Sequence, residues 1–358
     1  MQMKKVLIVT SVSGFVPQFE MNNVRILQKM GYEVHYAANY NMVGYGTDNH
    51  RLDHTGIICH QVDFTRSPYN IKRNKKVYLQ LKNLMEKENF TLLHCHTPVA
   101  SVLARLAARQ YRKNGMKVMY TAHGFHFFKG APWKYWCLFY PTERILAHMT
   151  DVLITINKED YLCAKRFCRH TNTKVKYIPG VGIDLNFWSG KDLKSGEREA
   201  IRKEVREHFG LEEDTTGLIS VGELIPRKNH EEVIRALVRQ KQQGQKFHYF
   251  ICGHGELQEY LQNLILEWKL SNEVTLLGYC DSNQVRNYLY GMDVFVFPSK
   301  QEGLPVALME AIATGIAVRA SNIRGNRDLI RNKENISKYD IHLIRKKMEE
   351  IYTETLSS

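Results

Sequence analysis

The most informative stretch of the sequence is 298–310, Pro-Ser-Lys-Gln-Glu-Gly-Leu-Pro-Val-Ala-Leu-Met-Glu, which directly follows an apolar run at 294–297. The pattern predicts a strand, a turn and then a helix with Pro305 at its first position, which proline favours. Main-chain amides of Gly303, Leu304 and the first helical turn would then face a ligand, with the helix dipole adding positive potential. The stretch therefore predicts an anion site suited to a diphosphate.

Two carboxylates, Glu302 and Glu310, flank this turn eight residues apart. If the whole run were helical they would be about 12 Å apart, which matches the span of a nucleotide sugar. Glu310 can accept hydrogen bonds from both ribose hydroxyls, and Glu302 from hydroxyls of the sugar. The alternative is that Glu302 is an ordinary loop carboxylate and Glu310 an exposed helix charge.

A pair of cations, Arg227 and Lys228, follows a predicted strand at 217–221 and a turn at 222–226. Adjacent cations at a strand's carboxyl end can neutralise a pyrophosphate and the charge that develops on it as a leaving group. In other transferases a divalent metal supplies this positive charge. Because the two cations can supply it here, we predict a site without a metal. A solvated pair of charges is the alternative.

His123 is a further candidate, since it ends the predicted strand 117–122 and precedes Gly124. A lone histidine is more often structural than functional. The turn that contains Gly14 and Phe15 follows the first predicted strand, 6–10, and we expect its amides to approach the donor phosphate or the acceptor.

Three residues that end predicted strands in the second half are candidates for a nucleoside pocket: Gly253, Gly278 and Tyr279. The alternative for each glycine is a tight turn that only glycine adopts without strain.

Apolar strand-like runs alternate with helical patterns through both halves of the chain, which predicts an α/β fold with two doubly wound, Rossmann-like domains. We place the first domain at 1–185, the second at 190–335 and a terminal amphipathic helix within 340–358, packing back on the first domain. The polar stretch 189–199 is interpreted as a linker that leads into a helix at 199–209. Open sheets of this kind bind ligands at the carboxyl ends of their strands, so a cleft between the domains is the expected substrate site.

Several segments together resemble retaining family 4 glycosyltransferases with the GT-B fold, of the exopolysaccharide and capsular type, and the similarity extends over nearly the whole chain. Glu302 to Glu310 resembles the family's E-x7-E motif. The other matching stretches are YTAHGFH at 120–126, VLITINKED at 152–160, IPGVGID at 178–184 and SVGEL at 220–224.

The resemblance implies two domains that face a central cleft and metal-independent transfer of a hexosyl or N-acetylhexosaminyl group with retention. The donor would be a UDP-sugar and the acceptor a polyprenyl-diphosphate-linked or other saccharide, with no cofactor. His123 would contact the transferred sugar, Arg227 and Lys228 the diphosphate. A nucleotide-sugar epimerase of the same fold and a catalytically impaired relative remain alternatives.

The chain departs from the family pattern at several points, and the shortening of the second domain is the one that motivates the impaired alternative. Glu223 stands where many relatives carry Arg, and only one glycine, Gly14, stands where relatives often have two. About one strand and one helix after 322–330 are missing, so the second domain is predicted to be shortened. Arg319 interrupts an apolar strand at 316–320, where an unpaired buried charge would be costly.

Lys and Arg outnumber Asp and Glu by 50 to 37, a net charge of +13, which favours phosphate-bearing partners or an anionic membrane surface. We expect no nucleic acid partner, because no aromatic-basic module is present. The candidate surface consists of two basic clusters, and a plain solvated face is the alternative: Arg105, Arg109 and Arg112, and Lys72, Arg73, Lys75 and Lys76.

No signal peptide or membrane-spanning run is predicted, so we expect a cytoplasmic protein, peripheral on the inner face of the plasma membrane if it binds lipid. The seven cysteines are expected to be free thiols. No zinc site is predicted at His94-Cys95-His96, because neighbouring strand residues point to opposite faces.

Overall fold

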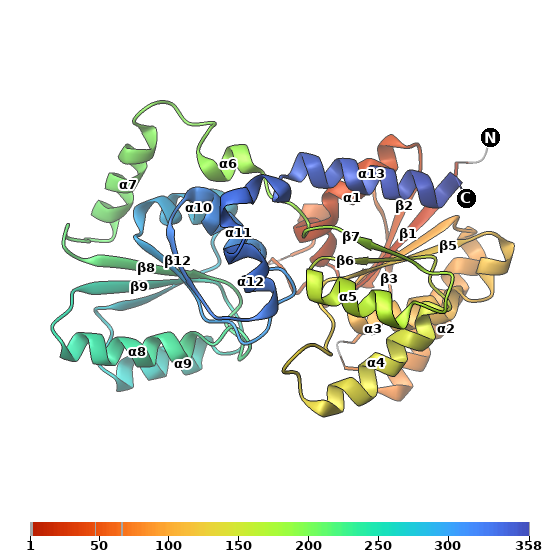
Figure 1. Ribbon diagram of the computed structural model, residues 1–358, viewed down its shortest axis with the longest axis horizontal. Coiled ribbons are helices and arrows are strands. Elements are labelled where there is room, and N and C mark those ends of the chain that lie inside the picture. The colour runs from red at the N-terminus through yellow and green to blue at the C-terminus, as the bar shows by residue number, and fades with distance from the viewer. Residues whose placement is uncertain (1–2, 47, 66, 358) are drawn as a thin grey trace. The chain divides into compact units, whose positions relative to one another are not determined.

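The computed structural model describes residues 3–46, 48–65 and 67–357, which form two compact units (Figure 1). Unit 1 contains the residues up to Gly182 together with those from His342 onward, and unit 2 is Ile183–Ile341. The chain crosses between the units twice, and the two crossings pair: the Ile183 amide donates to the Tyr339 carbonyl and the Ile341 amide to the Ile183 carbonyl, at 3.0 and 2.9 Å.

Unit 1 is built on a seven-stranded parallel sheet in the order β3-β2-β1-β4-β5-β6-β7. Its central strands are apolar on both faces, as strands of a fully covered parallel sheet must be. The strands are β1 (Lys5–Val12), β2 (Glu33–Asn39), β3 (Ile58–Gln61), β4 (Leu92–Cys95), β5 (Lys117–Ala122), β6 (Val152–Thr155) and β7 (Lys174–Tyr177).

Helices cover both faces of this sheet and bury one apolar core on each (Figure 1). Helices α1 (Met21–Lys29) and α13 (Ile341–Ser357) lie on one face. The opposite face carries α2 (Ile71–Glu88), α3 (Pro98–Ala108), α4 (Trp133–Ala147) and α5 (Lys158–Phe167). Short helical turns are Val16–Glu20, His50–Leu52 and Tyr111–Asn114.

The terminal helix α13 is attached to the sheet of unit 1 through a buried histidine. The Tyr352 hydroxyl lies 2.7 Å from Nδ1 of His94, whose Nε2 lies 2.8 Å from the Thr121 hydroxyl. Cys95 packs in the core on the other face, so the two side chains diverge as the alternation of a strand requires. At the helix end, Glu354 also pairs with Lys174 and Lys176.

Unit 2 has a five-stranded parallel sheet in the order β10-β9-β8-β11-β12. Its strands are β8 (Thr216–Val221), β9 (Phe247–Cys252), β10 (Val274–Gly278), β11 (Val294–Phe297) and β12 (Ala317–Ala320). Its helices are α6 (Leu185–Ser189), α7 (Glu197–His208), α8 (His230–Gln242), α9 (Gln258–Glu267), α10 (Ser282–Gly291), α11 (Val306–Thr314) and α12 (Arg324–Ile330), followed by a 3-10 segment, Lys333–Tyr339.

Three sequence expectations for unit 2 were wrong in detail. The predicted linker at 189–199 overlaps the last residue of α6 and the first residues of α7, which begins at Glu197, two residues earlier than predicted. Pro305 is the N-cap of α11 rather than its first residue. Arg319 is exposed, because β12 is an edge strand, so its charge carries no burial penalty.

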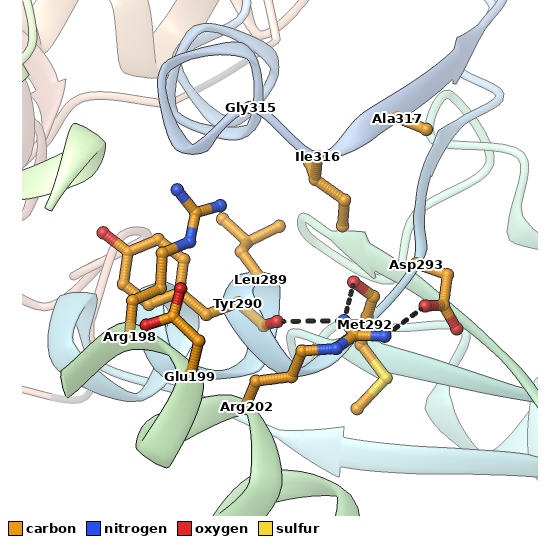
Figure 2. A pocket seen from close by; sticks show the side chains of 10 residues that line it. All are labelled: Arg198, Glu199, Arg202, Leu289, Tyr290, Met292, Asp293, Gly315, Ile316 and Ala317. Carbon is orange, nitrogen blue, oxygen red and sulfur yellow. Dashed lines mark hydrogen bonds and ion pairs between the residues drawn. The ribbon is translucent and has the colours of Figure 1, made fainter. Parts of the chain in front are cut away.

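Helix α7 is tied to the amino-terminal edge of the sheet by Arg202, at the hollow that Figure 2 shows. One guanidinium nitrogen of Arg202 donates to the carbonyls of Tyr290, Gly291 and Met292 at 3.2–3.3 Å, and the other contacts Asp293 at 2.6 Å. A cation here satisfies carbonyls that the end of α10 leaves without helical partners. This hollow therefore lies at the edge of the sheet opposite to the strands' carboxyl ends.

We predict that Arg202→Met lowers the free energy of unfolding of unit 2 by about 1–3 kcal/mol, because it removes the hydrogen bonds to the three carbonyls and the ion pair with Asp293, which keeps only Arg206 and the Gly217 amide as partners. Urea unfolding followed by amide hydrogen exchange of β8 and β11 measures this unit by itself. Lys203→Met is the matched control, since Lys203 makes only an exposed ion pair with Glu207. Equal stability of the two variants would contradict the structural role of Arg202.

Candidate functional site

Each sheet has one point at which the strand order reverses, between β1 and β4 in unit 1 and between β8 and β11 in unit 2. Loops that leave the carboxyl ends of such neighbouring strands diverge and leave room for a ligand. In unit 2 these are the loops 222–229 and 298–305, which contain the predicted basic pair and the predicted anion-binding turn. The structure therefore brings the two strongest sequence motifs to one place.

At this switch point between β8 and β11, a buried carboxylate is held by two cations. Glu302 is 8% exposed, and its two carboxylate oxygens lie 3.0 Å from Nη1 of Arg227 and 2.7 Å from Nζ of Lys228. Burial raises the pKa of Glu302, but Lys228 and Arg227 lower it more, so its pKa lies below the ordinary value. Glu302 is thus an anion at neutral pH, and the pair of cations is already partly neutralised.

The two loops are also joined through their main chains. The Lys300 amide donates to the Arg227 carbonyl at 2.8 Å, and Nη1 of Arg227 donates to the Gln301 carbonyl at 3.0 Å. From α12, Nε of Arg324 donates to the Glu302 carbonyl at 3.0 Å. These bonds fix the turn before α11, so its amides have a set direction before any ligand binds.

The amides of Gly303 and Leu304 precede α11 and, within the described part of the chain, no hydrogen bond from either is found. Leu304 is 6% exposed, which anchors the turn to the interior of unit 2. Amides at a helix N-terminus without internal partners attract anions. This turn therefore has the form of an anion site next to Lys228 and Arg227.

Glu310 lies one turn into α11, and its carboxyl group is half-buried. Burial raises its pKa to about 8. No hydrogen bond or ion pair of its carboxyl group is found among residues 3–46, 48–65 and 67–357. A desolvated carboxyl group without a partner is a potential acceptor for ligand hydroxyls.

The three residues predicted for a nucleoside pocket end β9 and β10. Gly253 has φ of +150°, and a Cβ there would overlap the Gly222 carbonyl, so close approach of two turns explains this glycine without a ligand. Gly278 has φ of +70° with open space around it, and the Tyr279 side chain is half exposed. Their contact with a nucleoside stays a prediction.

In unit 1, His123 lies in a cluster that the sequence did not reveal. Its Nε2 is 3.1 Å from Nδ1 of His96 and 3.4 Å from Oε1 of Glu20, and that oxygen is 3.5 Å from the same His96 nitrogen. His96 and Glu20 are buried, whereas the His123 side chain is 22% exposed. Burial, with His94 and His123 nearby, holds the pKa of His96 well below its ordinary value, so His96 is neutral.

This cluster follows from topology rather than from any motif. Glu20 ends the helical turn after β1, His96 follows β4 and His123 follows β5, and these strands are neighbours in the sheet. The only available signal was that each residue comes directly after a predicted apolar strand or turn. The three ligand atoms lie within 4.8 Å of one another, a spacing that fits shared protons and also a metal ion.

The predicted role of the Gly14 turn needs correction. The amides of Ser13 and Gly14 donate to the carbonyls of Met42 and Val43 at 3.3 and 2.8 Å, so they are not free to bind a phosphate in this conformation. Gly14 is required because a Cβ would overlap the carbonyls of Val43 and Tyr45. Phe15 instead packs edge-on against the His123 ring, with centroids 4.9 Å apart.

One predicted basic face is also corrected. Arg105 is 1% exposed and forms a bidentate ion pair with Glu143, with distances of 2.9 and 3.0 Å. Arg112 forms an ion pair with Asp151. They are therefore not available to a membrane, because their charges are already matched inside unit 1. Of the second cluster, Lys76 pairs with Asp63. The described part of the chain contains no helix long and apolar enough to span a bilayer.

Two Rossmann-like units of parallel strands, the second with a turn of unpaired amides and a basic pair at its switch point, define a glycosyltransferase of the GT-B fold. Comparison with known proteins gives the family. Residues 21–187 match the pattern described as "Glycosyltransferase Family 4" and residues 201–356 that described as "Glycosyl transferases group 1". The chain belongs to this family of glycosyltransferases.

Similar proteins agree with this assignment. A Bacillus subtilis (strain 168) protein designated as the glycosyltransferase EpsD is 34% identical over 98% of this chain and 87% of its own length. The Escherichia coli UDP-Gal:alpha-D-GlcNAc-diphosphoundecaprenol alpha-1,3-galactosyltransferase is 30% identical over 73% of this chain and 65% of its own. Relatives also include colanic acid and amylovoran biosynthesis glycosyltransferases, so the chain is of the exopolysaccharide type.

Solved structures show the same fold at low identity. Sucrose-phosphate synthase from Thermosynechococcus elongatus has a TM-score of 0.72 at 14% identity, covering 99% of both chains. Anabaena HepE in complex with UDP and glucose has a TM-score of 0.67 at 16% identity, also covering 99% of both. These likenesses establish the fold and not the substrate.

We predict that Glu310→Gln gains stability over the parent as the pH rises from 5 to 8. The folded parent keeps the Glu310 proton up to a pKa of about 8, whereas the unfolded chain loses it near the ordinary 4.5, so folding becomes less favourable through this range. The difference in free energy of unfolding should grow on the order of 1 kcal/mol per pH unit and level off above pH 8.

Urea unfolding of both proteins at several pH values measures this difference, because all other titrating groups cancel. Glu259→Gln, at an exposed position on α9, is the control and should show no such trend. A difference between parent and Glu310→Gln that stays constant from pH 5 to 8 would contradict the elevated pKa.

Proposed function

We propose that this protein transfers a hexosyl or N-acetylhexosaminyl group from a UDP-sugar to a polyprenyl-diphosphate-linked saccharide, without a metal and with retention of anomeric configuration. The observation that carries the proposal is the constellation at the switch point of unit 2: unpaired amides of Gly303 and Leu304, the cations Arg227 and Lys228, and two carboxylates at fixed places.

The donor diphosphate would bind to the amides of Gly303 and Leu304 and to the two cations. A diphosphate brings two negative charges, so it competes with Glu302 for Lys228 and Arg227 and frees oxygens of Glu302 for hydroxyls of the sugar. Glu310 would accept hydrogen bonds from the two ribose hydroxyls. These bonds would stabilise the ionised form of its carboxyl group, which burial disfavours. Uridine is favoured because the E. coli relative is named for UDP-Gal and HepE was solved with UDP.

In the proposed reaction, the bond between the anomeric carbon and the diphosphate oxygen breaks while the acceptor hydroxyl attacks from the same face. The acceptor proton passes to the departing phosphate oxygen, so UDP leaves with that proton and the sugar keeps its configuration. Arg227 and Lys228 stabilise the negative charge that develops on the leaving group. His123, oriented by Glu20 and neutral His96, would donate a hydrogen bond to the sugar.

The proposed acceptor and the proposed location of the protein are supported by the name of one relative and by the net charge of the chain. The E. coli relative is named for a diphosphoundecaprenol-linked acceptor, and such lipids lie in a bilayer. A net charge of +13 favours contact with the anionic inner face of the plasma membrane. We therefore place the protein in the cytoplasm, peripheral on that face.

We predict that UDP stabilises the protein more than GDP or ADP, and that the ribose hydroxyls supply part of the effect through Glu310. A ligand at about 100 times its Kd adds about 2.7 kcal/mol to the free energy of unfolding. Replacing UDP by 2′,3′-dideoxy-UDP should weaken binding by the parent about tenfold, as expected for the loss of hydrogen bonds from two ribose hydroxyls. In Glu310→Gln the difference between the two nucleotides should be smaller, because an amide oxygen is a weaker acceptor than a carboxylate.

Calorimetric titration of both nucleotides into both proteins measures this cycle, with Glu259→Gln as the control that should behave as the parent. Equal discrimination by the parent and by Glu310→Gln would exclude Glu310 as the ribose acceptor. If no nucleotide bound the parent, the catalytically impaired alternative would replace the proposal.

We predict that transfer continues unchanged in excess EDTA, because Arg227 and Lys228 supply the positive charge that a metal would otherwise provide. The assay is UDP release that depends on a polyprenyl-diphosphate-linked saccharide, with the anomeric configuration of the product read by NMR. Loss of activity that zinc or manganese restores would assign a metal to the Glu20, His96 and His123 cluster instead. A product of inverted configuration would rule out the proposed reaction.

A further inference from the structure

Unit 1 contains an apolar groove of about 590 Å³ on the face of its sheet that carries α2, α3 and α4. Each of these helices contributes a stripe of side chains at helical spacing. Among them are Lys75 from α2, Val99, Val102 and Leu106 from α3, and Leu138 and Glu143 from α4.

The walls of the groove are apolar and incompletely covered. Val102 and Leu103 are half-buried, while Leu106 and Leu138 are 37% and 41% exposed. Glu143, which also lines the groove, is matched by Arg105 at 2.9 and 3.0 Å. The groove therefore presents hydrocarbon and no unmatched carboxylate, which suits an apolar occupant.

The groove begins at the carboxyl edge of the sheet of unit 1. Helices that follow parallel strands start at the carboxyl edge of the sheet, so Pro98 at the start of α3 and Gly124 after β5 lie at that edge. The α3 stripe then runs from Val99 to Leu106, about 10 Å at ~1.5 Å per residue. A chain-like ligand would thus have one end beside Pro98 and Gly124 and its body along α3.

The edge at which the groove begins is basic. Lys75 lines the groove, and Lys72 is one turn earlier on α2. Both are exposed, and neither has an ion pair among residues 3–46, 48–65 and 67–357. Two unpaired cations beside an apolar channel complement a ligand with an anionic head and a hydrocarbon chain.

We propose that this groove binds the isoprenoid chain of a polyprenyl-diphosphate acceptor, with the diphosphate at Lys72 and Lys75. The inference rests on the proposed function, since it names how the acceptor of that reaction is held. The chain would lie along the α3 stripe, and the saccharide beyond the diphosphate would extend toward His123.

The test is photo-crosslinking of the full chain with a benzophenone-bearing farnesyl diphosphate, mapped by mass spectrometry. We expect labelled peptides from α2, α3 and α4, with labelling abolished by geranylgeranyl diphosphate but not by inorganic pyrophosphate. Leu138→Asp and Leu106→Asp should each reduce labelling about tenfold, because a charge replaces an apolar contact. Ile145→Asp is the matched control: Ile145 is 61% exposed on α4 and does not line the groove.

Three outcomes would overturn the proposal: labelling outside these helices, labelling of Leu138→Asp equal to that of Ile145→Asp, or competition by phosphatidylglycerol vesicles as strong as that by geranylgeranyl diphosphate. The last would show a bilayer contact in place of an isoprenoid site. Melting curves and UDP binding of the same variants confirm that unit 2 is intact. Because labelling needs no donor, failure of UDP binding alone would refute the proposed donor site and leave the groove standing.

Discussion

The contact on which the candidate site depends is the pairing of one buried carboxylate, Glu302, with Arg227 and Lys228. It joins the loops after β8 and β11, which are the two strands between which the order of the sheet reverses. A buried ion pair of this kind adds little net stability, since desolvation offsets much of the attraction. Its effect is instead to hold two cations next to the Gly303 turn, where one competing diphosphate can replace the carboxylate.

Unit 1 is organised by a comparable constraint, in which histidines at the ends of neighbouring strands are held by buried partners. His94 holds the terminal helix through Tyr352, while His96, one residue beyond β4, contacts His123 and lies near Glu20. A long C-terminal excursion of the chain therefore returns to the same sheet that positions His123. His94, which contacts the terminal helix, and His96, which contacts His123, are separated by a single residue of one segment.

Local patterns in the sequence were sufficient for the α/β class, for the strands that precede the candidate site residues (6–10, 117–122, 217–221 and 294–297) and for the turn at 298–305, because parallel strands and helix starts have strong periodic and proline signals. They were insufficient where a long-range contact decides. Arg105 was interpreted as a surface cation because its spacing is helical, but Glu143, 38 residues later, buries it. Arg319 was expected to be buried because it interrupts an apolar run. It is exposed because β12 lies at the edge of the sheet, and that position follows only from the strand order.

The Glu20, His96 and His123 cluster could not be predicted for the same reason, since three loops of the sheet must be placed before the residues meet. By contrast, the basic pair and the Gly303 turn were each predicted from local signals, and topology then brought them together. Assigning residues to turns is thus within reach of a single sequence, and assigning partners to buried charges requires the fold.

The most direct test of the central claim is a crystal structure with UDP bound. The account predicts that the diphosphate lies against the amides of Gly303 and Leu304 within reach of Lys228, that Glu302 gives up part of its ion pairing, and that Glu310 accepts the ribose hydroxyls. A nucleotide bound elsewhere, for instance at the hollow beside Arg202, with Glu302 still held by both cations, would contradict it.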